Sequence, residues 1–133
     1  DGEGDFTEAL RAVAEEFDLG VAVYSALASG FLSGKYRREA PEPSSPRAGS
    51  VQARYVSDPR ALALLESAGE IARRKGATVA QVALAWALAV PRVTSVIASA
   101  TSPEQLSELL GVVAVELDEK DLAELDRTAG AAS

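Results

Sequence analysis

The stretch VAVYSALASGFLSGKY, residues 21–36, decides the fold class. It follows Gly20, which ends a helical pattern, and it opens with an apolar run over 21–24 that predicts a short buried strand. Small and polar residues come next, as is typical of the turn after a strand. A second apolar run, 95–98, predicts another short buried strand, and polar residues follow it as well.

Helical patterns lie before, between and after these two runs. We expect helices over 6–18, from Asp58 to about Lys75, over 79–90, over 103–110, and after Asp118. Strands that alternate with helices predict βαβ units and a parallel sheet. Two short strands cannot form a stable parallel sheet alone, so the chain is either a small helical domain with two strands or part of something larger. The long loop over 35–58 favours the second alternative, because structureless loops of that length are uncommon inside compact domains.

Local signals predict where the helices begin and end. Three residue pairs have the capping-box spacing, in which each side chain bonds the backbone amide of the other residue: Asp5 with Glu8, Thr78 with Gln81, and Ser102 with Gln105. Prolines at 59 and 103 suit the first turn of a helix. Gly76 is expected to end its helix, after the basic residues 73–75 that favour the negative end of the helix dipole.

Composition excludes several classes of function. The 133 residues carry 20 acidic and 13 basic side chains, a net charge of −7, which argues against a nucleic-acid-binding role. No apolar run approaches the ~18 residues that a membrane span needs, so we expect no membrane association. Cysteine and histidine are absent, which excludes disulfides, thiolate or histidine metal sites and a Ser-His-Asp triad. The lack of cysteine fits a reducing, cytoplasmic location.

The positive charge of the chain is concentrated in its middle. Residues 35–60 carry six basic and three acidic side chains, against the acidic balance of the whole chain. A local basic segment on an acidic protein suits a small anionic ligand better than a polyanion. The alternative is a solvated loop that is simply rich in arginine.

Two segments share a layout that suits phosphate binding. Each predicted strand is followed by small polar residues, first at 25–34 and then at 99–105. Hydroxyls and unpaired amides near a helix start bind phosphate oxygens well, and ligands of parallel α/β folds lie at the carboxyl ends of the strands. The alternative is that these serines only cap turns and helices.

Three segments resemble the aldo-keto reductase family. Residues 23–36 resemble a family stretch that runs Tyr-Ser-Pro-Leu, then Gly, Leu and Gly-Lys-Tyr. Residues 79–88 look like its seventh helix, and 93–106 look like its eighth strand and the helix after it. The resemblance covers residues 6–128 and corresponds to about the last two-fifths of a complete member.

This resemblance implies a fold and a cofactor. The fold is the C-terminal part of a (β/α)₈ TIM barrel, with two parallel strands and five helices, and residues 1–133 form one unit. The cofactor is a nicotinamide dinucleotide, usually NADP, bound without a Rossmann motif. By position, Tyr24 would lie under the nicotinamide ring. The pyrophosphate would be held by Ser25, Leu27, Ser29, Gly30 and Leu32, and the adenosine end by Ser99, Thr101, Gln105 and Glu108.

The chain departs from the family pattern at four positions in or beside this set. Ala26 replaces a proline, Ser99 a common glycine, Leu109 an asparagine that bonds adenine, and Thr101 a basic residue that often binds the 2′-phosphate. The family's catalytic Asp, Tyr, Lys and His lie on earlier strands that have no counterpart here. Lys35 and Tyr36 do not replace them, because adjacent residues in an extended segment point apart.

The expected function is therefore an NADP(H)-dependent oxidoreductase that reduces aldehydes or ketones to alcohols. This chain would supply the cofactor-binding side and no catalytic residue. Its expected partners are the dinucleotide, a small carbonyl substrate in the complete barrel, and either a complementary N-terminal half or a second copy. One alternative is a non-enzymatic nucleotide-sensing or regulatory subunit on the same fold, and another is a small helical interaction module.

Overall fold

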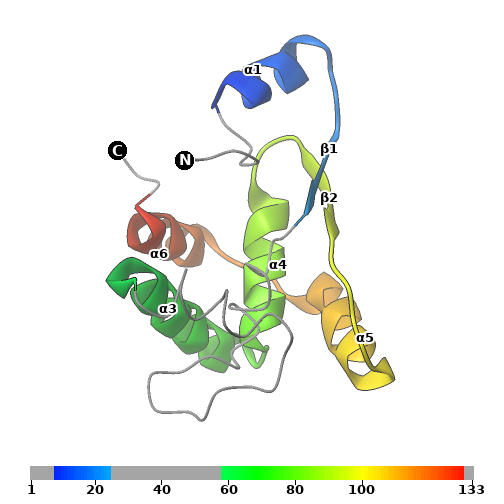
Figure 1. Cartoon of the computed structure of the whole chain (residues 1–133). Helices are drawn as coiled ribbons and strands as arrows, with labels where there is room; N and C mark the ends of the chain where they lie inside the picture. The colour runs from blue at the N-terminus through cyan, green and yellow to red at the C-terminus, as the bar shows by residue number, and fades with distance from the viewer. Residues whose placement is uncertain (1–7, 25–57, 131–133) are drawn as a thin grey trace.

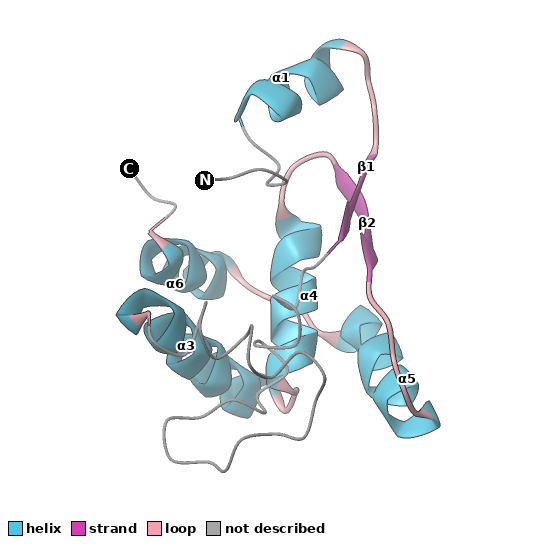
Figure 2. Ribbon diagram, in the orientation of Figure 1, coloured by secondary structure: helices cyan, strands magenta, loops and turns pink. Residues whose placement is uncertain are grey.

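The computed structural model describes residues 8–24 and 58–130. Within them the chain forms α1 (Glu8–Glu16), β1 (Val21–Tyr24), α3 (Pro59–Lys75), α4 (Val79–Ala89), β2 (Val93–Ile97), α5 (Pro103–Leu110), the 3₁₀ helix η3 (Gly111–Ala114) and α6 (Glu119–Ala129). Figures 1 and 2 show the two strands side by side, with α4 next to them and α3 and α6 beyond α4. The α/β class with two parallel strands and five α-helices is confirmed for the described residues.

β1 and β2 pair in parallel. Tyr24 lies opposite Ile97, so both strands end at the same edge of the sheet. Alternate residues of β1 are half-buried, and the half-buried residues of β2 are Val93 and Val96. Because α4 packs beside β2, we assign these half-buried side chains to the face that α4 covers.

A small apolar core lies between the helices. Its fully or nearly buried members are Ala68, Ile71 and Ala72 of α3, Val82 of α4 and Leu125 of α6. α4 is apolar almost all round, so it can bury one side against α3 and α6 and another against β2. Contacts with α3 and α6 thus hold α4 in place against the strands.

The helix ends of α3 and α4 confirm the local signals. Asp58 caps α3, Pro59 is its first residue, and Gly76 ends it with a left-handed φ of 63°. Thr78 and Gln81 form a reciprocal capping box at the start of α4. Asp5, which would cap the first helix, lies outside the described residues.

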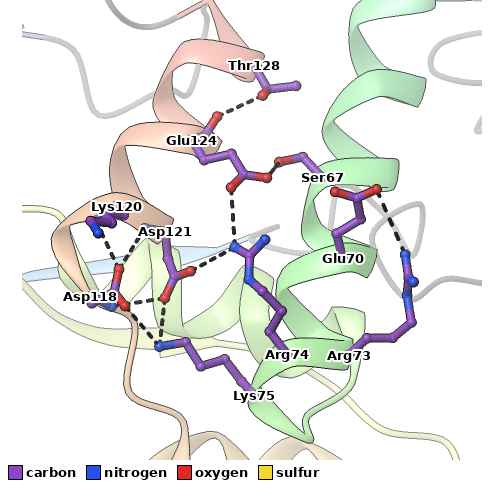
Figure 3. Close-up of polar contacts among 10 residues, drawn as sticks. All are labelled: Ser67, Glu70, Arg73, Arg74, Lys75, Asp118, Lys120, Asp121, Glu124 and Thr128. Carbon is purple, nitrogen blue, oxygen red and sulfur yellow. Dashed lines mark hydrogen bonds and ion pairs between the residues drawn. The ribbon is translucent and has the colours of Figure 1, made fainter.

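An ion-pair cluster joins α3 to α6 (Figure 3). The Asp121 carboxylate is nearly buried and lies 2.8 Å from Lys75 Nζ and 3.0 Å from Arg74 Nη2. Arg74 also reaches Glu124 at 3.2 Å, and Lys75 reaches Asp118 at 3.3 Å. The basic end of α3 therefore does more than complement the helix dipole, because it holds α6 against α3.

Some expected boundaries were wrong. β2 covers Val93–Ile97 rather than 95–98, because Val93 already pairs with Val21. α4 ends at Ala89 rather than at 90, and α1 (Glu8–Glu16) ends at Glu16 rather than at 18, while the expected start at residue 6 lies outside the described residues. No sequence pattern predicted η3, and the long loop over 35–58 lies outside the described residues except for Asp58. Among the described residues, none of the helices combines the length and the hydrophobicity of a membrane-spanning segment.

Candidate functional site at the carboxyl edge of the strands

The candidate site begins where β1 and β2 end together. Tyr24 and Ile97 lie opposite each other in the sheet, and they are 66% and 59% exposed, respectively. The two strands therefore end at adjacent points of one edge (Figure 1), and the second polar segment named from the sequence, 99–105, follows β2 there. The pyrophosphate candidates of the first segment, 25–32, lie outside the described residues.

The second segment runs from β2 into α5 and is held by a compact set of hydrogen bonds. Ser102 caps α5 by accepting from the Gln105 backbone N–H at 3.2 Å, and Pro103 is the first helical residue. Gln105 Oε1 accepts from both the backbone N–H and the hydroxyl of Thr101, each at 2.9 Å. Thr101 and Gln105, two of the predicted adenosine-end residues, are thus brought into contact.

The expected capping box at Ser102 was half wrong. Ser102 accepts from the Gln105 backbone as expected, but the Gln105 side chain bonds Thr101 instead of the Ser102 amide. With Oε1 occupied by two donors, the Nε2 amide is the part of Gln105 that can donate to a ligand. Ser99 lies exposed between β2 and this turn.

Glu108 is positioned by a contact that sequence reasoning missed. Gln81 Nε2 donates to the Glu108 carbonyl oxygen at 2.7 Å, which links the first turn of α4 to α5. Gly111 makes room for this side chain, because a Cβ at position 111 would collide with Gln81 Nε2. The sequence spacing of Gln81 predicts only a capping residue, and a glycine directly after a helix is too common to indicate a bridge. Glu108 follows Gln105 by three residues, so both lie on one side of α5.

The first turn of α5 already holds a negative charge. Glu104 lies there, and two hydrogen bonds lower the pKa of its carboxyl group below the usual value. The larger effect comes from its own backbone amide and the smaller from the Ser102 hydroxyl. An acidic side chain at this end also suits the helix dipole. The α5 N-terminus is therefore a less favourable phosphate site than a helix N-terminus without an acidic residue.

The model of the Aldo/keto reductase family matches residues 4–129. The chain belongs to the aldo/keto reductase family. This confirms the resemblance that residues 23–36, 79–88 and 93–106 indicated.

The curated relatives are about three times as long as the chain. A Schizosaccharomyces pombe protein named "Putative voltage-gated potassium channel subunit beta" is 36% identical over 121 residues, which are 86% of this chain and 34% of that protein. The L-glyceraldehyde 3-phosphate reductase of Escherichia coli strain K12 is 32% identical over 115 residues, 82% of this chain and 33% of the reductase. The chain thus spans about a third of the length of these two relatives.

A solved structure supports the fold. The glycerol dehydrogenase of Gluconobacter oxydans superposes with a TM-score of 0.73, at 23% identity, over 95% of this chain and 40% of that chain. At this identity the likeness concerns the fold alone. The described strands and helices therefore form part of an aldo/keto reductase barrel, as expected.

Proposed function

We propose that this chain supplies the cofactor-binding side of an NADP(H)-dependent aldo-keto reductase that reduces aldehydes or ketones to alcohols. The observation that carries the proposal is the pairing of Tyr24 with Ile97. It starts both candidate segments from one edge, in a chain that belongs to a reductase family. The barrel fold favours ligands at that edge.

The side chains present at this edge fit a nicotinamide dinucleotide. The exposed ring of Tyr24 offers a flat apolar surface of the kind that stacks on an aromatic base. The Ser99 hydroxyl and the Gln105 amide can donate to phosphate or ribose oxygens, and the Glu108 carboxylate can accept from ribose hydroxyls or the adenine amine. Bound there, the cofactor would supply the hydride, while these residues bind and orient it.

The proposed cofactor site has ten residues. It comprises Tyr24, Ser25, Leu27, Ser29, Gly30, Leu32, Ser99, Thr101, Gln105 and Glu108. We assign the pyrophosphate to the first segment, because Glu104 already occupies part of the α5 N-terminus. We assign the adenosine end to the second segment, where Thr101, Gln105 and Glu108 lie along the start and one side of α5.

A substitution at Gln105 tests this proposal. Gln105→Glu keeps an oxygen that can accept both bonds from Thr101, but it removes the Nε2 donor and adds a negative charge. We expect an unchanged melting temperature and a Kd for NADPH that rises roughly three- to tenfold, the value of about one hydrogen bond. The control is Ser107→Ala, an exposed position on α5 outside the proposed site. Calorimetric titration of the three proteins decides, and equal NADPH affinities would contradict the proposal.

A second candidate function is a non-enzymatic nucleotide-sensing or regulatory subunit. It is favoured by the relative whose name describes a potassium channel subunit beta. Both candidates require NADPH binding, but only the first requires turnover. Oxidation of NADPH by a panel of small aldehydes and ketones, measured on the protein that carries residues 1–133, separates them. Tight binding without turnover would favour the regulatory subunit.

A further inference from the structure

β2 has one residue more than β1 over their paired length. Val21 lies opposite Val93, but Ala22 lies opposite Ser95, so Thr94 bulges out of the ladder. After the bulge the pairing is regular and ends with Tyr24 opposite Ile97. Both Thr94 and Ser95 are exposed, which breaks the alternation of a regular strand.

The spacing of the valines in β2 explains the bulge. Val93 and Val96 are both half-buried although they are three residues apart, whereas a regular strand places residues two apart on one face. Without the bulge, Ser95 would join Val93 on the covered face and Val96 would turn to the exposed face. That exchange would bury a hydroxyl and expose an apolar side chain, so the bulged register is favoured.

A glycine on the neighbouring segment accommodates the bulge. The Thr94 side chain lies over the entry to β1, where its hydroxyl donates to the Val21 carbonyl oxygen at 3.4 Å. A Cβ at Gly20 would be 2.8 Å from Thr94 Cγ2, which is closer than real Cβ contacts. Gly20 therefore leaves the space that the bulged residue fills.

We propose that the bulge at Thr94 positions Tyr24 within the cofactor site. The bulge sets the register that places Tyr24 beside Ile97, and thereby the place of Tyr24 relative to the segment 99–105. This inference rests on the proposed function. A slip of one residue would pair Tyr24 with Val96 and move Tyr24 by ~3.3 Å along the strands relative to Ile97 and the segment 99–105. The bulge acts on the site through Tyr24, since Thr94 itself lies near the opposite end of β2.

Restoring regular alternation in β2 tests the register. The double variant Ser95→Val with Val96→Ser has the same composition but places apolar residues at 93, 95 and 97. We expect Tyr24 to pair with residue 96 in this variant, as read from cross-strand backbone contacts in NMR spectra, and the Kd for NADPH to rise about tenfold or more. The control is Ser95→Thr, which keeps a polar residue before Val96 and should keep both the register and the affinity.

A second pair of variants does not depend on the double variant folding. Gly20→Ala should collide with Thr94 and weaken NADPH binding by several-fold, at ~1 kcal/mol per fivefold. Adding Thr94→Ala removes the colliding atoms and should restore the affinity and the wild-type cross-strand contacts. If Gly20 affected NADPH binding by a route other than its contact with Thr94, adding Thr94→Ala would restore neither the affinity nor the contacts.

The outcomes separate the two proposals. A wild type whose Tyr24 contacts residue 96, or a register that shifts without loss of affinity, would overturn the positioning role. Absence of rescue by Thr94→Ala would overturn it as well. A wild type that shows the expected register but does not bind NADPH would instead overturn the proposed function.

Discussion

Lys75 Nζ at the end of α3 lies 2.8 Å from the Asp121 carboxylate in the first turn of α6. Asp121 is also the capping-box partner of Asp118, and its Oδ2 accepts from the Asp118 backbone N–H at 3.1 Å. The nearly buried Asp121 carboxylate thus takes part in the N-terminal cap of α6 and also links α6 to α3 by ion pairs (Figure 3). Two predictions concern this residue.

Neutralising Asp121 should destabilise the packing of α6 on α3. Asp121→Asn keeps one oxygen for the cap but loses the charge that Lys75 and Arg74 face. We expect a loss of about 1.5–3 kcal/mol of unfolding free energy, the usual range for hydrogen bonds to charged groups. Glu119→Gln is a matched control, because it removes an exposed acidic charge from the same turn. Urea unfolding curves measure both, and equal midpoints would contradict this role of Asp121.

Acid should loosen the same contact. Burial acts to raise the pKa of Asp121, but hydrogen bonds from Lys75, Arg74 and the Asp118 amide outweigh it and lower the pKa from 3.8 to about 2. A carboxyl group whose pKa is lower in the folded state binds protons more readily when unfolded. Its contribution to stability is therefore complete above its ordinary pKa and is lost as the pH falls toward 2. Unfolding free energies measured between pH 5 and 2 should fall less steeply in Asp121→Asn than in the wild type.

Filling Gly111 should break the bridge from α4 to α5. The backbone of Gly111 has a φ of −63°, so alanine is allowed there, and among the described residues only the Gln81 side chain would collide with its Cβ. We expect Gly111→Ala to destabilise the wild type by about 1 kcal/mol, since the Gln81 bond to Glu108 is lost. In a Gln81→Ala background the same change should be neutral or should stabilise by about 0.4–1 kcal/mol, as alanine restricts the unfolded chain. A double-mutant cycle with additive effects would contradict the bridge.

The described surface carries several large exposed apolar side chains. They include Phe17, Tyr24, Ile97, Leu110 and Val113, which are 59–89% exposed. We therefore expect the isolated chain to associate with itself or with a complementary half of the barrel. Analytical ultracentrifugation tests this expectation, and a sharp monomer that melts cooperatively would contradict it.

The sequence predicted features that depend on neighbours along the chain. The caps at Asp58 and Thr78 and the αL glycine at 76 need only local geometry, and all three are confirmed. The Lys75–Asp121 ion pair could not be predicted from the sequence, because it forms only when α3 packs against α6. The bulge in β2 could not be predicted from the apolar run 95–98, because Val93, which pairs with Val21 before the bulge, lies outside that run.

The sequence likewise predicted only part of the candidate site. Parallel strands bring their carboxyl ends together, so the meeting of Tyr24 and Ile97 follows from the βαβ pattern. The bond from Thr101 to Gln105 does not follow from it, because two backbone amides compete for one side-chain oxygen. Which amide wins depends on the path of the turn before α5.

Hydrogen exchange with and without NADPH tests the central claim most directly. Backbone amides at Tyr24 and over 99–105 should exchange more slowly when NADPH is bound, because the ligand covers the carboxyl edge of the strands. The amides of α6 over 119–129 serve as the internal reference and should not change, since they lie on the far side of α4 from the strands. Protection confined to the carboxyl edge is the predicted result. Protection elsewhere, or no change at Tyr24 and 99–105 under saturating NADPH, would contradict the assignment of this edge as the cofactor site.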